Sequence, residues 1–514
     1  MPAHLKALIV ILGIASVVFF LAKVPACAMA MTEKDFARRR NLWFAITLAA
    51  FLAYNFWVYI VVAAVLLLFA LPREPNKFAM FLFLLFAVPT IPAKISGLGI
   101  VEHFFAIHYV RLLALAVLLP AFLQLWKRPE SEPFGRLLPD KLVAAYLILQ
   151  FALTVSDNSL TQTLRHGAFY AFIDVFLPYY VASRSLRNPQ EFRDALMAFV
   201  VAALVLSAIG IFEYAKQWLL YKELEATLGA ERWGYGNYTL RGESLRAIGT
   251  TGQPIVLGYV VVVAMALYLY LRKLVPSAIL WSLGLLLLVG GLIAPVSRGP
   301  WVGAAAMLLA FAALGPTPIR GLVKLGLAGA LVFAMLMMSP VSEKVIDLLP
   351  FVGTVEEHNI TYRQRFVEVS IDMVMQNPLF GYRNYVDLVE MDELKPQGLL
   401  DTLNVFLTVA LGSGLVGLTL FAGFFLSVAV VIFRGMRSEL DRNGELYLLG
   451  RALLAALAGI VVIINTVSPI LFIPVIYWSM AGLGVAYACM LARLRTPADV
   501  RSTGLRAGFA RMKT

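Results

Sequence analysis

The chain is dominated by long apolar runs that short polar segments separate. Most runs contain about 20 residues, the length that a helix needs to cross a hydrocarbon core of about 30 Å. The runs are continuous and lack the period-two alternation of barrel strands, so they predict transmembrane helices. The predicted spans are 5–26, 42–71, 78–93, 107–126, 140–156, 167–183, 194–215, 253–272, 276–296, 300–315, 322–340, 403–433, 449–466 and 470–492.

Composition supports this pattern, since 61% of the 514 residues are hydrophobic and only 14% are charged. A soluble domain is about half apolar and about a quarter charged. The sequence therefore predicts an all-α polytopic integral membrane protein with about 12–15 transmembrane helices and two long extracytoplasmic loops. The run 42–71 is either one tilted helix or two short helices broken near Asn55.

The positive charges lie in one set of connections, which indicates orientation. By the positive-inside rule, these connections are cytoplasmic. With the basic tail and the N-terminal basic groups included, about 27 basic and 12 acidic residues lie on this side, which accounts for the net charge of +12. The excess thus reflects topology, and no nucleic-acid partner is expected. The groups are Lys127/Arg128/Arg136, Arg184/Arg187/Arg193, Arg272/Lys273, Arg320/Lys324, Arg434/Arg437/Arg442/Arg451, Arg38–Arg40 and Arg73/Lys77.

The remaining connections are then extracytoplasmic, and two of them are long, at 216–252 and 341–402. Long ordered loops usually carry function. We expect N-terminal transmembrane helices (1–140), core transmembrane helices (141–340), a large loop (341–402), C-terminal transmembrane helices (403–492) and a basic cytoplasmic tail (493–514). The first run mimics a signal peptide. We favour a retained anchor helix, and Met31 is an alternative start.

Few residues suit a metal centre. The two cysteines lie at opposite ends of the chain, and the five histidines show no ligand spacing. No metal, disulfide or cofactor is predicted.

Two arginines on the expected outer face are candidate anion ligands. Arg298 lies in the tight turn Pro295–Trp301, where an arginine is costly to bury and a guanidinium suits phosphate. Its alternative role is that of a snorkelling interfacial residue. Arg246 precedes a stretch of glycines and threonines whose backbone N–H groups suit an anion. Alternatively, Thr250 or Thr251 simply caps the next helix.

The second long loop and one span hold further polar candidates. Asp401 or His358 is a candidate general base, and Asn404 lies at the outer mouth of the 403–433 span. Solvated loop charges are the simpler interpretation of each charged residue. Asp174 lies within a span, where it either pairs with an arginine or relays protons. The loop also contains the candidates Arg363 and Arg365.

Five short motifs over about 140–490 resemble the O-antigen ligase and polymerase superfamily of bacterial surface-polysaccharide assembly. They are Phe176–Tyr180, Arg246–Thr250, Ser297–Trp301, Asn377–Tyr382 and Gly412–Gly417. The resemblance implies metal-independent glycosyl transfer at the outer leaflet of the bacterial inner membrane, from a glycan on polyprenyl (undecaprenyl) diphosphate. It implies that Arg246 and Arg298 bind the diphosphate.

One departure from the family pattern bears on the type of enzyme. The His-Asn pair of the ligases falls on Leu403-Asn404, so the histidine is missing and Asp401 or His358 is left as a substitute base. This favours an exopolysaccharide or O-antigen polymerase over a ligase that moves glycan to a lipid or protein acceptor. A flippase for lipid-linked sugars and a structural subunit of an export complex remain alternatives. Other polysaccharide assembly and export proteins are candidate partners.

Overall fold

The computed structural model describes most of the chain. The described residues are 1–97, 103–157, 159–230, 239–241, 244–273, 275, 277–338, 357–394, 402–470 and 472–495. Within these ranges the protein is almost entirely helical, which confirms the predicted all-α class. Ten helices among the described residues are long and apolar enough to cross a membrane, and α13 and α14 are shorter apolar helices.

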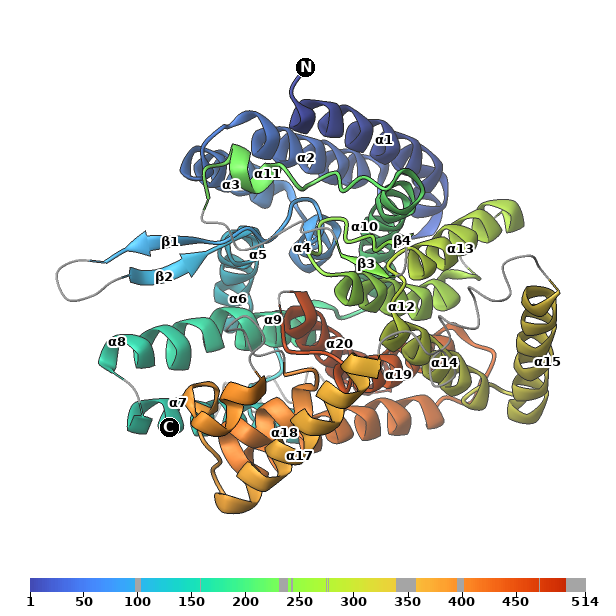
Figure 1. Cartoon of the computed structure of the whole chain (residues 1–514). Helices are drawn as coiled ribbons and strands as arrows, with labels where there is room; N and C mark the ends of the chain where they lie inside the picture. Colours follow the sequence, from blue (N-terminus) through green and yellow to red (C-terminus); the bar gives the residue numbers. More distant parts are fainter. Residues whose placement is uncertain are drawn as a thin grey trace, which may run out of the picture.

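The helices form a bundle in which α10, α12 and α20 are the most enclosed (Figure 1). The helices of the N-terminal half are α1 (Ala3–Met29), α2 (Glu33–Leu52), α3 (Phe56–Ala70), α4 (Lys77–Leu84), α5 (Tyr109–Leu113), α6 (Leu119–Trp126), α7 (Leu138–Asp157), α8 (Leu160–Gln162), α9 (Leu177–Ser185), α10 (Pro189–Lys216) and α11 (Leu224–Thr227). Those of the C-terminal half are α12 (Pro254–Leu271), α13 (Ala278–Ile293), α14 (Arg298–Ala313), α15 (Pro318–Met337), α17 (Glu357–Gln376), α18 (Val405–Arg437), α19 (Glu445–Ile464) and α20 (Phe472–Arg495). The π-helical segments η2 (Ala114–Leu118) and η3 (Thr163–Phe176) join α5 to α6 and α8 to α9.

Two short hairpins interrupt the helical pattern. Strands β1 (Ala93–Ser96) and β2 (His103–Ile107) pair antiparallel, with Lys94 opposite Ala106, and the hairpin projects from the bundle (Figure 1). Strands β3 (Leu240–Arg241) and β4 (Ser244–Leu245) form the smaller hairpin, which precedes α12.

The run 42–71 forms two helices, and this resolves the alternative that the sequence left open. Helix α2 ends before Tyr54, which has a positive φ of 49°. The side chain of Asn55 then accepts hydrogen bonds from the backbone N–H groups of Trp57 and Val58 and caps α3. A residue of this type is favoured at a helix N-terminus because its oxygen satisfies an orphan donor.

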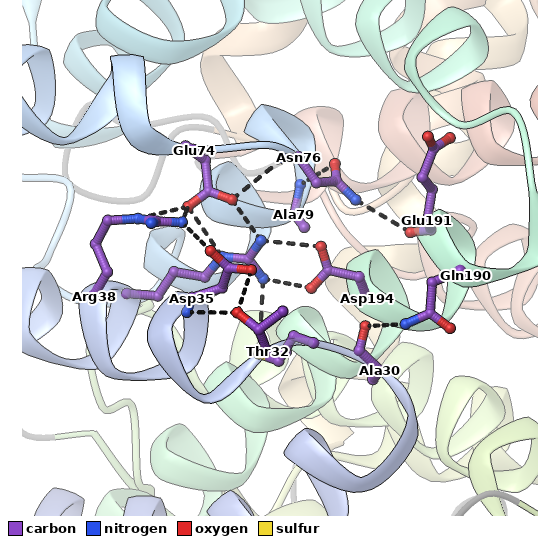
Figure 2. A network of polar contacts seen from close by, with 12 residues as sticks. Ala30, Thr32, Asp35, Arg38, Glu74, Asn76, Ala79, Gln190, Glu191 and Asp194 are labelled. Carbon is purple, nitrogen blue, oxygen red and sulfur yellow. Dashed lines mark hydrogen bonds and ion pairs between the residues drawn. The ribbon is translucent and has the colours of Figure 1, made fainter.

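One end of the bundle, which we call the basic end, contains the connections rich in Lys and Arg. Arg39 is fully buried there and donates to Glu74 Oε1 at 2.6 Å and to Asp194 Oδ2 at 3.0 Å. Figure 2 shows Glu74 and Asp194 on opposite sides of this network, which Arg38 and Asp35 extend. Buried charges need such pairing, and here it ties α2 and the segment after α3 to α10.

The opposite end of the bundle, the loop end, contains the turns after α10, α13 and α19 and the approach to α18. Its connections are joined by hydrogen bonds between distant segments: Ala247 N donates to Ala294 O, and Leu403 N donates to Ser468 Oγ. The positive-inside rule predicts that this end faces the extracytoplasmic side.

Helix α18 is interrupted where it meets the segment that follows α17. Gly414 has φ 63° and ψ −168°, so the helix is broken at this residue. The backbone of 378–382 fills the break: Tyr382 N donates to Leu411 O at 2.6 Å, and Leu415 N donates to Pro378 O at 2.7 Å. Gly381 lies against the same break with φ 63°. The sequence motifs Asn377–Tyr382 and Gly412–Gly417 therefore form the two sides of one backbone junction.

Candidate functional site

The turn between α13 and α14 is the centre of the candidate site at the loop end. Val296 has a positive φ of 45°, which costs a β-branched residue energy and reverses the chain sharply. The indole of Trp301 donates to Leu292 O at 3.0 Å and closes the turn. Arg298 is the first residue of α14, and its side chain is partly exposed.

The structure brings Arg246 to this turn. The Nε atom of Arg246 donates to Pro295 O at 3.2 Å, and the next residue, Ala247, donates its N–H to Ala294 O. Arg246 and Arg298, which are 52 positions apart in the sequence numbering, therefore flank one four-residue turn. The carbonyl contact orients the Arg246 guanidinium at this turn, and a guanidinium is a group that suits an anion.

A third arginine, which the sequence reasoning missed, lies at the same turn. Arg241 Nη1 donates to Val296 O at 2.9 Å, and its side chain is partly buried. The residue ends the two-residue strand β3, and no motif surrounds it. Its proximity to the turn depends on the β3–β4 hairpin, which only the folded chain reveals.

The glycine and threonine stretch after Arg246 has a different role from the one expected. The carboxylate of Glu213, which is fully buried in α10, accepts the N–H groups of Ile248 at 3.0 Å and Gly249 at 2.8 Å. These amides therefore bind an internal anion rather than a ligand. Thr250 and Thr251 are also buried, and their hydroxyls donate to backbone carbonyls.

The capping alternative was wrong, because the N-cap of α12 is Gln253 rather than either threonine, and two of the amides expected to suit a ligand are bonded to Glu213 instead. Glu213 is a second residue that sequence reasoning missed. In the sequence, Glu213 is an acidic residue in the last turn of an apolar helix, and nothing distinguishes it from other carboxylates at a membrane interface. The structural effect is that Glu213 fixes the backbone directly beyond Arg246.

Asn404 lies on the other side of the turn. It caps α18, with its Oδ1 accepting from Phe406 N at 2.8 Å, and its Nδ2 lies 3.5 Å from Asn465 Oδ1. Thr466, the next residue, contacts Gly299: a Cβ on that glycine would lie 2.5 Å from Thr466 Oγ1. Asn404 thus joins the site through the α19–α20 turn.

Asp174 lies elsewhere and is paired. Arg111 Nη2 donates to Asp174 Oδ2 at 2.7 Å, and the Arg111 guanidinium lies 3.5 Å from the Tyr170 ring centroid. The structure therefore confirms the expected pairing with an arginine, and it separates Asp174 from the arginines of the α13–α14 turn.

The other predicted loop residues are only partly described. Arg363 and Arg365 are exposed on α17, and Arg365 lies 3.6 Å from Glu368. His358 belongs to the first turn of α17, and its side chain lies outside the described part of the chain. Asp401 also lies outside it, directly before the buried Thr402. Both remain candidate bases on the grounds given by the sequence. Among the described residues, no group of three His, Cys, Asp or Glu side chains is arranged to hold a metal ion.

Comparison with known proteins gives a family match over part of the chain. No curated protein matches the chain. Residues 283–422 match the family model described as O-antigen ligase. The matched segment extends from α13 through the Arg298 turn and α17 to the Gly414 break of α18. Over residues 283–422, the match supports the resemblance to the O-antigen ligase and polymerase superfamily that the motifs carried.

Proposed function

We propose that the protein is a metal-independent glycosyltransferase of the bacterial inner membrane that polymerises polyprenyl-diphosphate-linked repeat units of an exopolysaccharide or O-antigen at the outer leaflet. The observation that carries the proposal is the gathering of Arg241, Arg246 and Arg298 around the α13–α14 turn, at the end opposite the basic connections. The diphosphate of a membrane lipid lies at this depth, and its negative charge complements the positive charge of the guanidinium groups.

The chemistry needs a nucleophile, a base and a stabilised leaving group. A hydroxyl oxygen of the acceptor sugar attacks the anomeric carbon of the donor glycan, and the bond from that carbon to the diphosphate oxygen breaks. The hydroxyl proton passes to a base, for which Asp401 and His358 are the candidates. The bond electrons leave with the polyprenyl diphosphate, whose growing negative charge Arg246 and Arg298 stabilise.

Ligation of glycan to a lipid or protein acceptor is the second candidate function. It is favoured by the description of the matched family, O-antigen ligase, and by the position of Asn404, which aligns with the asparagine of the ligase pair. The two functions share a donor site and differ in the acceptor.

Complementation of a deletion strain tests the proposal. Arg246→Ala and Arg298→Ala are expected to leave single repeat units and no long chains when surface and secreted polysaccharide is sized on a gel. Lys216→Ala is the matched control, because it removes a charge that is exposed in the last turn of α10, at the same end of the bundle. Asp401→Ala tests the substitute base. Long chains that persist on the polyprenyl carrier indicate a ligase instead. Unchanged chain length and attachment in both arginine variants would refute the diphosphate site.

A further inference from the structure

An apolar groove lies between α1, α10 and α13. Helix α10 packs between the other two helices and forms the floor of the groove (Figure 1). Among the described lining residues, Tyr268 of α12 is the one polar side chain. Leu21 and Leu283 on the rim are 44% and 49% exposed. An exposed apolar rim on a membrane-spanning bundle is a surface that faces acyl chains.

The groove lies in the half of the bundle next to the basic end. Gln190 Nε2 donates to Ala30 O at 2.8 Å, so the end of α1 and the start of α10 meet there. Of the lining residues, Pro25 lies about 6 Å of helix from the end of α1, and Met197 lies about 12 Å from the start of α10. Each leaflet contributes about 15 Å to the hydrocarbon core. The groove is therefore at the depth of the acyl chains of one leaflet, which the positive-inside rule predicts to be the cytoplasmic one.

A stack of three planar groups leads from the groove to its basic edge. Tyr268 lines the groove and stacks on Trp281, with ring centroids 5.9 Å apart and ring planes at 4°. The Tyr268 hydroxyl also donates to Trp281 O at 2.9 Å, which fixes the pair. The guanidinium of Arg272, the exposed residue that caps the C-terminus of α12, lies 5.0 Å from the Trp281 ring centroid. The stack thus places a cation where the groove reaches the membrane surface.

The basic edge keeps a net positive charge. Arg272 has no carboxylate partner among the residues that the structure describes, since its contact is with the indole ring. Lys273 is exposed beside it and donates to a carbonyl oxygen of the loop before α19. Of the acids at this edge, Glu445 is paired with Arg193, and Asp441 accepts a backbone N–H of the same loop. Asp441 can offset one of the two remaining cations, so one positive charge is left.

The groove and its edge complement the two parts of a phospholipid. Basic pockets between membrane helices on the cytoplasmic side suit anionic lipid headgroups, and a guanidinium pairs well with phosphate. We propose that the groove between α1, α10 and α13 binds an anionic glycerophospholipid such as phosphatidylglycerol, with an acyl chain in the groove and the headgroup at Arg272. The site is at the opposite end of the bundle from Arg246 and Arg298, and it does not depend on the proposed transfer function.

Native mass spectrometry of the full-length protein tests the headgroup. The protein is released from nanodiscs that contain equal amounts of phosphatidylglycerol and phosphatidylcholine with identical acyl chains, and the lipids that stay bound are counted. We expect the wild type to retain one phosphatidylglycerol in preference to phosphatidylcholine. Arg272→Gln should lower this preference about fivefold, since a basic side chain near the membrane surface contributes about 1 kcal/mol. Arg272→Lys, which keeps the charge, should retain most of it.

Arg437→Gln is the matched control for the charge. Arg437 is also exposed at the basic end, and its guanidinium also lies over an aromatic ring, 5.3 Å from the Phe433 centroid. It belongs to α18 rather than to a helix of the groove, so the lipid preference should not change.

Leu283→Trp tests the groove without changing a charge. Leu283 is on the exposed rim, so an indole there narrows the groove without entering the buried core, and the retained phosphatidylglycerol should be lost. Leu286→Trp is the control on the same helix, because Leu286 is 68% exposed and does not line the groove.

The outcomes decide between this site and its alternatives. Loss of phosphatidylglycerol in Arg272→Gln and Leu283→Trp, and in neither control, supports the site. Equal retention of the two lipids by the wild type overturns it, and so does a preference that Arg272→Gln and Arg437→Gln lower alike. Phosphatidylglycerol that Leu283→Trp leaves in place overturns the groove as the seat of the acyl chain. A dimer that Leu283→Trp dissociates would identify a second copy of the chain as the occupant and overturn the lipid assignment.

Discussion

Replacement of Gly414 by alanine is the sharpest test of the junction between the large loop and α18. At φ 63° and ψ −168°, Gly414 occupies a region of backbone space that is almost closed to other residues, which costs an alanine about 1–3 kcal/mol. The new Cβ would also lie 2.2 Å from Leu379 O and 2.5 Å from Phe380 N. Both are backbone atoms, so the segment 378–382 has to move.

That movement breaks hydrogen bonds across the junction. The bonds Tyr382 N to Leu411 O and Leu415 N to Pro378 O contribute about 0.5–1.5 kcal/mol each. Together with the backbone term, we expect Gly414→Ala to weaken local closure of the junction by about 2–6 kcal/mol.

Hydrogen exchange measured by mass spectrometry on the purified protein reports the Tyr382 amide directly. We expect exchange to be faster by about one to four orders of magnitude, at about 1.4 kcal/mol for each factor of ten. Gly423→Ala is the matched control in the same helix, since its nearest neighbour, Leu142 Cδ1, would lie at an ordinary 3.9 Å. Unchanged protection in Gly414→Ala would show that the helix break does not depend on glycine.

Two further substitutions test the packing of the bundle and of the site. Arg39→Ala leaves buried carboxylates without their partner and should lower the free energy of unfolding by about 3–5 kcal/mol. The control Lys23→Ala removes one member of an exposed pair and should lower it by at most about 1 kcal/mol. Equal denaturation midpoints of the two variants in detergent would contradict this reasoning. Glu213→Gln places an amide among backbone donors and should loosen Gly249, with polymer synthesis lowered about tenfold at unchanged protein level. The exposed Glu223→Gln is its control, and full activity of Glu213→Gln would show that the carboxylate does not position the segment.

Much of the fold follows from local sequence properties. A run of about 20 apolar residues predicts a membrane helix whatever it packs against. The split of 42–71 was also visible at Asn55, whose side chain caps α3. The π-helical stretch η3 was not predictable from the sequence, because over its few turns the spacing of apolar residues looks the same as in an α-helix.

The site was predictable only in part, for a physical reason. Arg246 and Arg298 were found because each stands next to a Gly-containing turn on the same expected face, and the structure places both at one turn. Arg241 and Glu213 were missed because their contacts join segments that only folding brings together. The local sequence shows which charged residue is costly to bury, but it does not show which residue that charge contacts.

The partner decides what an arginine does in this protein. At the basic end, Arg39 and Arg184 pair with carboxylates on other elements, Asp194 among them, so the charge is neutralised and the helices are held together. At the loop end, Arg241 and Arg246 donate to carbonyl oxygens of the α13–α14 turn. A carbonyl fixes the direction of a guanidinium, so under the proposed function a diphosphate would meet groups that are already oriented and would lose less free energy on binding. Counting basic residues thus predicts the orientation of the chain in the membrane, whereas only the folded chain shows that Arg39 and Arg184 join helices and that Arg241 and Arg246 meet at one turn.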